Sequence, residues 1–252
     1  MATRCCFMIL PMHLIMFIDT YICACRPILS QVCRYFRSHL HFQHVTARSS
    51  RTFSYVCTIV PYIRLLRIDL GSRVSRGDLW EHGCVHTQLV DEMHVVTAYE
   101  RFNFRMYSNV INIVRQACCK RLRWLSSSVP QNPGQMAALS NEVLCIPSLQ
   151  DVYIDCSWCN LGPRHINKIV RTPSASRIRL LTLDLSFNFV FDLQPLQKMQ
   201  HMPHITCLCI ILHNACTVDE SNVRDFLQTT HIECIVIKIA IIIGNHIVTK
   251  KE

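Results

Sequence analysis

The chain has 252 residues, half of them hydrophobic and 17% of them charged, and its formal net charge is +9. This length permits one or two domains with a substantial core, and the apolar content excludes disorder over most of the chain. Lysine and arginine residues are scattered rather than grouped in blocks, so solvated surfaces explain them better than a nucleic-acid interface does. The composition therefore predicts a folded protein whose partner is not a nucleic acid.

An apolar run near the N-terminus, residues 5–18, resembles a secretory signal peptide because Arg4 precedes it. However, Pro11 and His13 interrupt the run, and no cleavage site of small residues follows it. Its 14 residues are also too few to span a bilayer. The sequence therefore predicts a protein of the cytoplasm, the nucleus or both, with no membrane partner.

A pattern with apolar residues at its first, fourth and sixth positions recurs along the chain. It begins at Ile63, Leu149, Ile178, Ile205 and Ile232, and the last four beginnings are 29, 27 and 27 residues apart. Two weaker copies, Met93-x-x-Val96-x-Ala98 and Leu122-x-x-Leu125, fill the 86-residue gap between Ile63 and Leu149. A period near 28 indicates a solenoid, in which each unit buries its apolar face against its neighbours. The alternative is an ordinary α/β domain whose strands happen to be evenly spaced.

The repeated segments predict an α/β fold in which strands alternate with helices. Strands are expected at residues 39–46, 63–70, 93–98, 122–126, 149–156, 178–185, 205–212 and 232–239, and helices at 51–60, 108–119, 135–145, 164–170, 194–202 and 219–228. Strand and helix repeated in register place parallel strands on one face and helices on the other. We also expect Asn188 and Asn214 to be buried and to bond the backbone of adjoining turns, with Cys156 or Cys159 in that place one copy earlier.

The strand segment that ends at Asn188 resembles a leucine-rich repeat, so the expected solenoid covers residues 39–252. The sixteen cysteines agree with this fold, because many occupy its apolar positions and free cysteine behaves as a small hydrophobic residue. Cys156-x-x-Cys159 is either such a core pair or half of a zinc or redox site, but no second pair follows at ligand spacing. Cys207-x-Cys209 is expected to lie in a strand with both thiols on one face. We therefore predict no metal and no cofactor, and a reducing compartment.

The N-terminal segment differs from the repeats, because two short amphipathic helices are expected on either side of Pro27. Its residues resemble the F-box, which opens Leu-Pro-x-Glu-Leu and closes Leu-Ser-x-Val-Cys-Arg-x-Phe/Trp. The chain reads Leu10-Pro11-Met12-His13-Leu14 and later Leu29-Ser30-Gln31-Val32-Cys33-Arg34-Tyr35-Phe36. His13 replaces the usual Glu, and the loop before Leu29 is about one residue short, so the resemblance implies a weakened contact with the adaptor.

An F-box at residues 1–38 followed by leucine-rich repeats implies a substrate-receptor subunit of an SCF-type ubiquitin ligase. Such a subunit binds the Skp adaptor, and through it a cullin, and holds a protein substrate. The residues that the resemblance assigns to the adaptor are Leu10, Pro11, Leu14, Ile18, Val32 and Phe36. The alternative is a repeat scaffold whose N-terminal helices only cap the solenoid, with no ligase attachment.

Three aspartates, Asp69, Asp155 and Asp184, occupy matching exposed positions of the expected strands. They either keep the strand face soluble or form an acidic stripe that binds the substrate. No phosphate-binding glycine loop, paired-carboxylate site or nucleophile motif is visible, and the chain has only six glycines. The sequence therefore predicts a binding protein without an enzymatic activity of its own.

Overall fold

We describe a computed structural model of the chain. It describes residues 41–47, 62–70, 89–97, 104–126, 132–171, 176–190, 192–213, 220–241 and 244–250. The chain divides into two compact units, Met1–Leu40 and His41–Glu252. The F-box-like segment with its six adaptor residues, the expected helix at 51–60, and Asn214 lie outside the described residues. No helix in the described part of the chain is long and apolar enough to cross a membrane.

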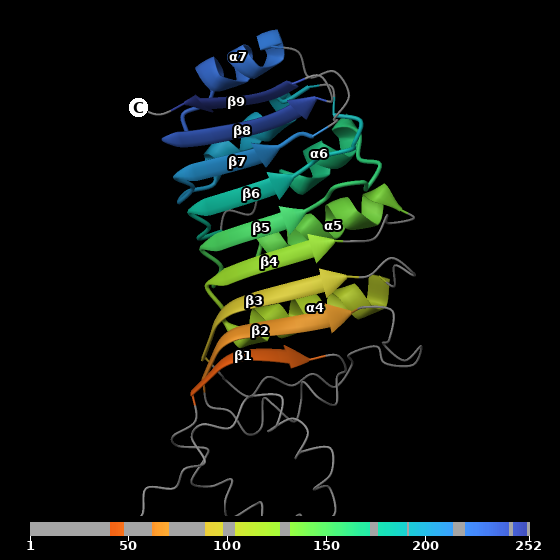
Figure 1. The fold of residues 1–252 in the computed structure, drawn as a ribbon, viewed down its shortest axis with the longest axis vertical. Helices are drawn as coiled ribbons and strands as arrows, with labels where there is room; N and C mark the ends of the chain where they lie inside the picture. Colours follow the sequence, from red (N-terminus) through yellow and green to blue (C-terminus); the bar gives the residue numbers. More distant parts are fainter. Residues whose placement is uncertain are drawn as a thin grey trace, which may run out of the picture. The chain divides into compact units, whose positions relative to one another are not determined.

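The second unit contains a single sheet whose strands follow one another in chain order (Figure 1). The strands are β1 (His41–Ala47), β2 (Tyr62–Leu70), β3 (Leu89–Thr97), β4 (Arg121–Ser126), β5 (Asp151–Asp155), β6 (Leu180–Asp184), β7 (Cys207–Ile211), β8 (Cys234–Ile241) and β9 (Gly244–Lys250). The first eight strands are parallel, as predicted. The ninth was not predicted, and it pairs antiparallel with β8.

Helices alternate with the strands, which confirms the predicted α/β fold. They are α4 (Phe104–Ala117), α5 (Pro133–Leu144), α6 (Pro163–Ile169), the 3₁₀ helix η3 (Gln194–His201) and α7 (Glu220–Thr229). Helices α4, α5 and α6 lie behind the sheet in Figure 1. From β3 to β8, successive strands pair in order with a helix between them, and this open arrangement is compatible with a solenoid.

The strand register places the repeated apolar positions side by side. It also corrects the predicted beginning of the pattern in two copies. The buried strand positions are Leu66, Met93, Leu122, Val152, Leu181, Leu208 and Ile235 in one row, and Ile68, Val95, Trp124, Ile154, Leu183, Ile210 and Ile237 in the next. In β3 and β4 the pattern begins at Val90 and Cys119, both buried, and not at Met93 and Leu122 as predicted. Val96 and Leu125 were therefore assigned wrongly to the core, because apolar residues also occupy the other face of these strands. The corrected beginnings are 27 to 30 residues apart throughout.

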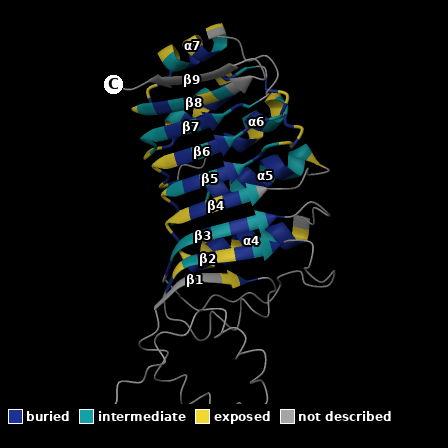
Figure 2. Cartoon of the chain, viewed as in Figure 1, coloured by how far each residue is buried: buried dark blue, intermediate teal, exposed yellow. Residues whose placement is uncertain are grey.

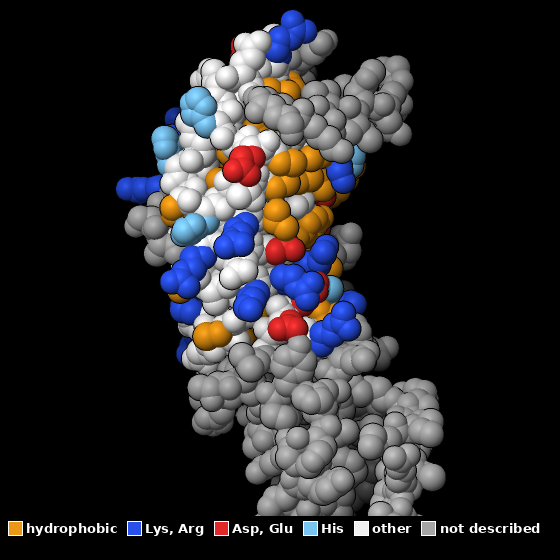
Figure 3. All heavy atoms as spheres, turned by 90° about the vertical axis from the view of Figure 1, so that its left-hand side faces the viewer, with side chains coloured by type: hydrophobic (Ala, Val, Ile, Leu, Met, Phe, Trp, Pro, Cys, Tyr) orange, Lys and Arg blue, Asp and Glu red, His pale blue; other side chains and the backbone are white. Residues whose placement is uncertain are grey.

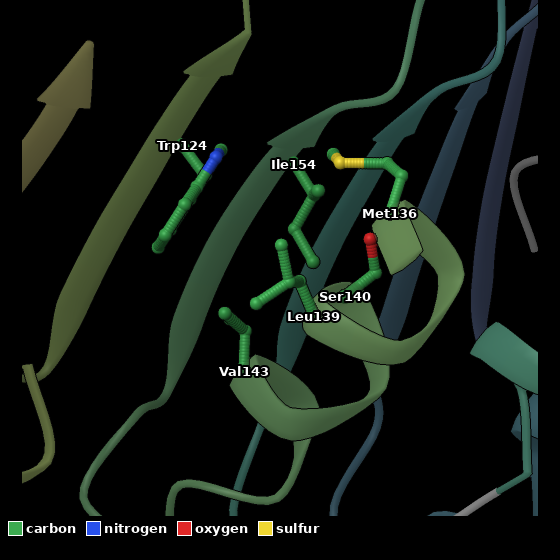
Figure 4. Close-up of a pocket in the computed structure, with 6 residues that line it drawn as sticks. All are labelled: Trp124, Met136, Leu139, Ser140, Val143 and Ile154. Carbon is green, nitrogen blue, oxygen red and sulfur yellow. The ribbon is translucent and has the colours of Figure 1, made fainter. Parts of the chain in front are cut away.

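Helix α5 shows how a helix closes the core against the sheet. Met136, Leu139, Ser140 and Val143 face Trp124 of β4 and Ile154 of β5, and the contact leaves no space for a water molecule (Figure 4). The helix begins at Pro133, two residues earlier than predicted, because the Asn132 side chain accepts hydrogen bonds from the amides of Gly134 (2.9 Å) and Gln135 (3.2 Å). Proline suits the first helical position, since it lacks an amide hydrogen that would need a partner.

Asn188 joins successive turns beyond the strands, as predicted. Its side chain is 2% exposed, and its Oδ1 accepts a hydrogen bond from the amide of Leu161 at 2.8 Å. Its Nδ2 lies within hydrogen-bonding distance of the carbonyl oxygens of Cys156 (2.8 Å), Leu185 (3.0 Å) and Ser186 (3.1 Å). In the preceding unit, buried Cys159 takes this place, and its thiol donates to the Ser157 carbonyl at 3.3 Å. The Asn188 side chain therefore satisfies backbone groups of two successive units at once.

Replacing Asn188 by alanine should lower the free energy of unfolding by about 2–4 kcal/mol, because several buried backbone groups lose their partner. The control is Asn112→Ala at an exposed position of helix α4, where the lost hydrogen bond, from Arg115, is also exposed. This control should change stability by less than about 0.5 kcal/mol. Chemical denaturation measures both, and equal effects of the two substitutions would contradict the role assigned to Asn188.

Leu180 and Leu181 test the assignment of the two faces of β6. Leu181 is 1% exposed, so Leu181→Ala should cost about 2–5 kcal/mol. Leu180 is 45% exposed, so Leu180→Ala should cost less than about 1 kcal/mol. Thermal or chemical denaturation of the two variants measures the difference, and a larger loss for Leu180→Ala would mean that the faces are assigned the wrong way round.

Candidate interaction surface

The side chains on the face of the sheet away from the helices form a surface that we call the open face. Alternate strand residues point to it, and most are exposed or half-buried (Figure 2). In register they form three rows: Leu65, Glu92, Arg121, Asp151, Leu180, Cys207 and Cys234; Arg67, His94, Arg123, Tyr153, Thr182, Cys209 and Val236; and Asp69, Val96, Leu125, Asp155, Asp184, Ile211 and Lys238. Neighbouring residues in a row come from strands about 4.8 Å apart, so each row is a nearly continuous line of side chains.

The part of the open face on β2, β3 and β4 is basic, and we call it the basic section. Its centre is Glu92, whose carboxylate lies 2.6 Å from His94 Nε2, 3.2 Å from Arg123 Nε and 3.5 Å from Arg121 Nη1. Arg67 is a further exposed cation, paired in register with His94. Three arginines, at positions 67, 121 and 123, outnumber the two carboxylates of Asp69 and Glu92 in these rows, so the section keeps a net positive charge.

Two opposing effects act on the Glu92 carboxyl. Burial alone would raise its pKa, but the hydrogen bond with His94 and the charge of Arg121 outweigh burial, so the pKa of Glu92 falls below its usual value. The carboxylate is therefore ionised at neutral pH and holds the arginines in place. Figure 3, which views the edge of the sheet where the parallel strands begin, shows lysine and arginine side chains near carboxylates in its lower part and a cluster of hydrophobic side chains above them.

The three aspartates predicted to bind a substrate do not form one stripe. Asp155 and Asp184 are paired in register on β5 and β6, whereas Asp69 lies on β2 and is separated from them by Val96 and Leu125 in the same row. The neighbouring pair shares one environment: burial, together with the charge of Asp184, raises the pKa of Asp155. The structure therefore brings two of the three predicted residues together.

Hydrogen bonds from nearby residues hold both carboxylates of this pair. The Ser157 amide donates to Asp155 Oδ1 at 2.9 Å, and the Ser186 amide donates to Asp184 Oδ1 at 3.0 Å. The Tyr153 hydroxyl donates to Asp184 Oδ2 at 3.4 Å, and burial and Asp184 raise the pKa of Tyr153. Each aspartate thus supports the turn that follows its strand.

On β6, β7 and β8 the open face is mainly apolar, and we call this part the apolar section. It consists of Leu180, Cys207, Cys209, Ile211, Cys234 and Val236, of which Leu180 is exposed and the others are half-buried. The predicted placement of both thiols of Cys207-x-Cys209 on one face is confirmed. Contiguous apolar side chains on a protein surface mark interaction sites more often than isolated ones do.

The Cys156-x-x-Cys159 pair lies in the core and not on this surface. Burial raises the pKa of Cys156 to about 12, and burial also raises the pKa of Cys159. Both thiols are therefore protonated at neutral pH in this metal-free structure, as expected for buried cysteines of a core. Within the described ranges, no group of three or more His, Cys, Asp or Glu side chains is arranged to hold a metal ion.

Sequence reasoning missed an aromatic stack at the ends of β5 and β6. Trp158 and Phe187 lie with ring centroids 4.1 Å apart and ring planes 12° apart, and Trp158 is 55% exposed. Both have a positive φ, 59° and 57°, which costs a bulky residue about 1–3 kcal/mol. The sequence shows that Trp158 and Phe187 occupy equivalent positions of the repeat, because they directly precede Cys159 and Asn188. It does not show their backbone conformation or the stacking of their rings.

No protein-family model matches the chain, and no relative was found among curated proteins. Any function assigned to the chain therefore rests on the geometry of the open face and on the motifs of the sequence.

Replacing Glu92 by glutamine should lower the free energy of unfolding at pH 7 by less than about 1 kcal/mol, because the ion pairs are partly exposed. A lowered carboxyl pKa contributes stability above the ordinary pKa of 4.5, and that contribution is lost as pH falls through the folded-state value. The difference between wild type and Glu92→Gln should therefore be smaller at pH 3 than at pH 7. Chemical denaturation at pH 7 and pH 3, repeated in the Arg123→Gln background, measures this difference in stability. An equal difference at the two pH values would contradict the ion pairing.

Proposed function

We propose that the chain is a substrate-receptor subunit of an SCF-type ubiquitin ligase. In this proposal residues 1–38 are an F-box that docks the Skp adaptor, and residues 39–252 are a leucine-rich-repeat solenoid that binds the target protein. The observation that carries it is the combination of two independent patterns in one chain. One is the Leu-Ser-x-Val-Cys-Arg-x-Phe segment that ends at Phe36, and the other is the stack of parallel strands.

Three features of the second unit support leucine-rich repeats. The strands pair in chain order, so each unit contacts the units before and after it. The corrected apolar patterns begin 27 to 30 residues apart, within the length of one such repeat. The Asn188 side chain bonds the backbone of adjoining turns, which is the role that asparagine has at the end of this repeat's strand segment.

The work of such a subunit is positioning. Adaptor binding would use Leu10, Pro11, Leu14, Ile18, Val32 and Phe36, and target binding would use the open face. Two binding surfaces on one chain raise the effective concentration of the target near the ligase. No residue of this chain performs the chemistry in this proposal, and the free cysteines suit the reducing cytoplasm or nucleus.

The charges of the open face indicate which target would fit. The basic section around Glu92 favours acidic side chains, and the apolar section around Leu180 favours apolar ones. Asp155 and Asp184, between these sections, would accept a basic side chain. Three strand spacings separate β4 from β7, about 14 Å, which an extended peptide covers in about four residues.

The second candidate is a repeat scaffold with an N-terminal helical cap and no ligase attachment. Terminal caps are general in solenoids, so the N-terminal helices expected from the sequence also suit this role. The two candidates share the open face as a binding surface and differ only in the adaptor.

Co-precipitation with a purified Skp adaptor separates the two candidates. The intact chain should bind the adaptor, and the double substitution Leu10→Ala with Pro11→Ala should reduce binding at least tenfold, because it removes apolar anchors of the interface. Leu180→Ala, on the sheet, is the matched control and should bind the adaptor as the wild type does. An intact, folded chain that fails to bind the adaptor would reject the ligase role and favour the scaffold.

A further inference from the structure

Two thiols of the apolar section lie directly opposite each other on neighbouring strands. Cys207 of β7 is paired in register with Cys234 of β8. The backbone holds this pairing, because the amide of Cys234 donates to the carbonyl of Thr206, the residue directly before Cys207, at 2.9 Å. Both cysteines are half-buried, and neither forms a disulfide in this structure.

The geometry of a parallel pair brings these sulfur atoms within reach of each other. Neighbouring strands lie about 4.7–4.9 Å apart, inside the range of about 4.4–6.8 Å between the Cα atoms of a disulfide. Paired residues of a parallel sheet also point to the same face, so the two side chains need no backbone inversion to meet. The third thiol of the section, Cys209, is paired with Val236 and has no cysteine opposite it.

We propose that Cys207 and Cys234 are a reversible disulfide site, oxidised by low-molecular-weight disulfides such as glutathione disulfide. The thiolate of one of the two cysteines attacks one sulfur of the reagent, forms a mixed disulfide and releases one glutathione thiol. The thiolate of the other cysteine then attacks the protein sulfur of the mixed disulfide and releases the second glutathione. The two protein thiols lose two electrons and two protons, and the reagent gains them as two thiols. This site does not depend on the proposed ligase role.

Two properties make the bond reversible and not permanent. A disulfide needs a distance of about 3.5–4.5 Å between its two Cβ atoms, so a bridge between directly paired strand residues pulls these atoms together. A strained or exposed disulfide is easily reduced. In the resting state, burial and the neighbouring Cys234 raise the pKa of Cys207 to about 11, so Cys207 persists as a thiol at neutral pH. Oxidation would replace two thiols beside Leu180 by a fixed link between β7 and β8, and so alter the apolar section.

The test is oxidation of the full-length folded chain with excess glutathione disulfide, followed by alkylation, digestion with trypsin and mass spectrometry. Trypsin separates residues 199–224, which contain Cys207, from residues 225–238, which contain Cys234. The wild type should yield these two peptides joined by a disulfide, and dithiothreitol should release them. Cys209→Ser is the matched control and should form the link to at least half the wild-type extent.

Cys207→Ser and Cys234→Ser should each reduce the linked peptides at least tenfold, while circular dichroism confirms that both variants fold. The proposal is overturned if the wild type forms no link between these peptides. It is also overturned if the link persists in Cys207→Ser, because another thiol of residues 199–224 would then be the partner.

Discussion

Each unit of this sheet buries its apolar strand residues against the units before and after it, and this mutual burial is the constraint on which the structure depends. Leu181 and Leu183 have their counterparts in Val152 and Ile154 on one side and in Leu208 and Ile210 on the other. The rows remain aligned because successive strands have the same register. The connecting segments differ in form, from α-helix to 3₁₀ helix, and the sheet tolerates this variation.

The same register determines the chemistry of the open face. Successive side chains of a strand point to opposite faces of the sheet, so a row of residues buried in the core is followed by a row on the open face. Residues almost thirty positions apart in the chain then become neighbours, as Glu92 and Arg121 do. The described strands thus present a continuous surface whose charge and apolar character change from strand to strand. This is why we regard the sheet face, rather than a cavity, as the site of action.

The sequence predicted those features that repeat. Ile178, Leu181 and Leu183 are buried in the expected pattern, and Asn188 bonds adjoining turns, because these roles depend on local spacing alone. The patterns at Met93 and Leu122 were misplaced by three residues, since β3 and β4 carry apolar residues on both faces and periodicity cannot then identify the buried one. The start of α5 was missed because the capping by Asn132 was not considered. Strand β9 was also missed, because it carries no copy of the repeated apolar pattern.

Asn188 apart, the side-chain contacts between units were not predicted. The cations around Glu92, the separation of Asp69 from Asp155, and the pairing of Cys207 with Cys234 all require the register across strands. The stack of Trp158 on Phe187 additionally requires a left-handed backbone in two successive turns. A single sequence shows which residues occupy equivalent positions, but not which of these positions bring side chains together.

Deletion of one complete unit tests the central claim most directly. Removing residues 180–206 joins Arg179 to Cys207, the register partner of Leu180, so every remaining strand keeps a neighbour of the same pattern. The shortened chain should fold cooperatively, with mixed helix and strand content in its circular dichroism spectrum and with reduced stability. Removing residues 180–193 alone, about half a unit, should abolish cooperative unfolding because the register is lost. If both deletions unfold the chain equally, the units do not stack as interchangeable repeats.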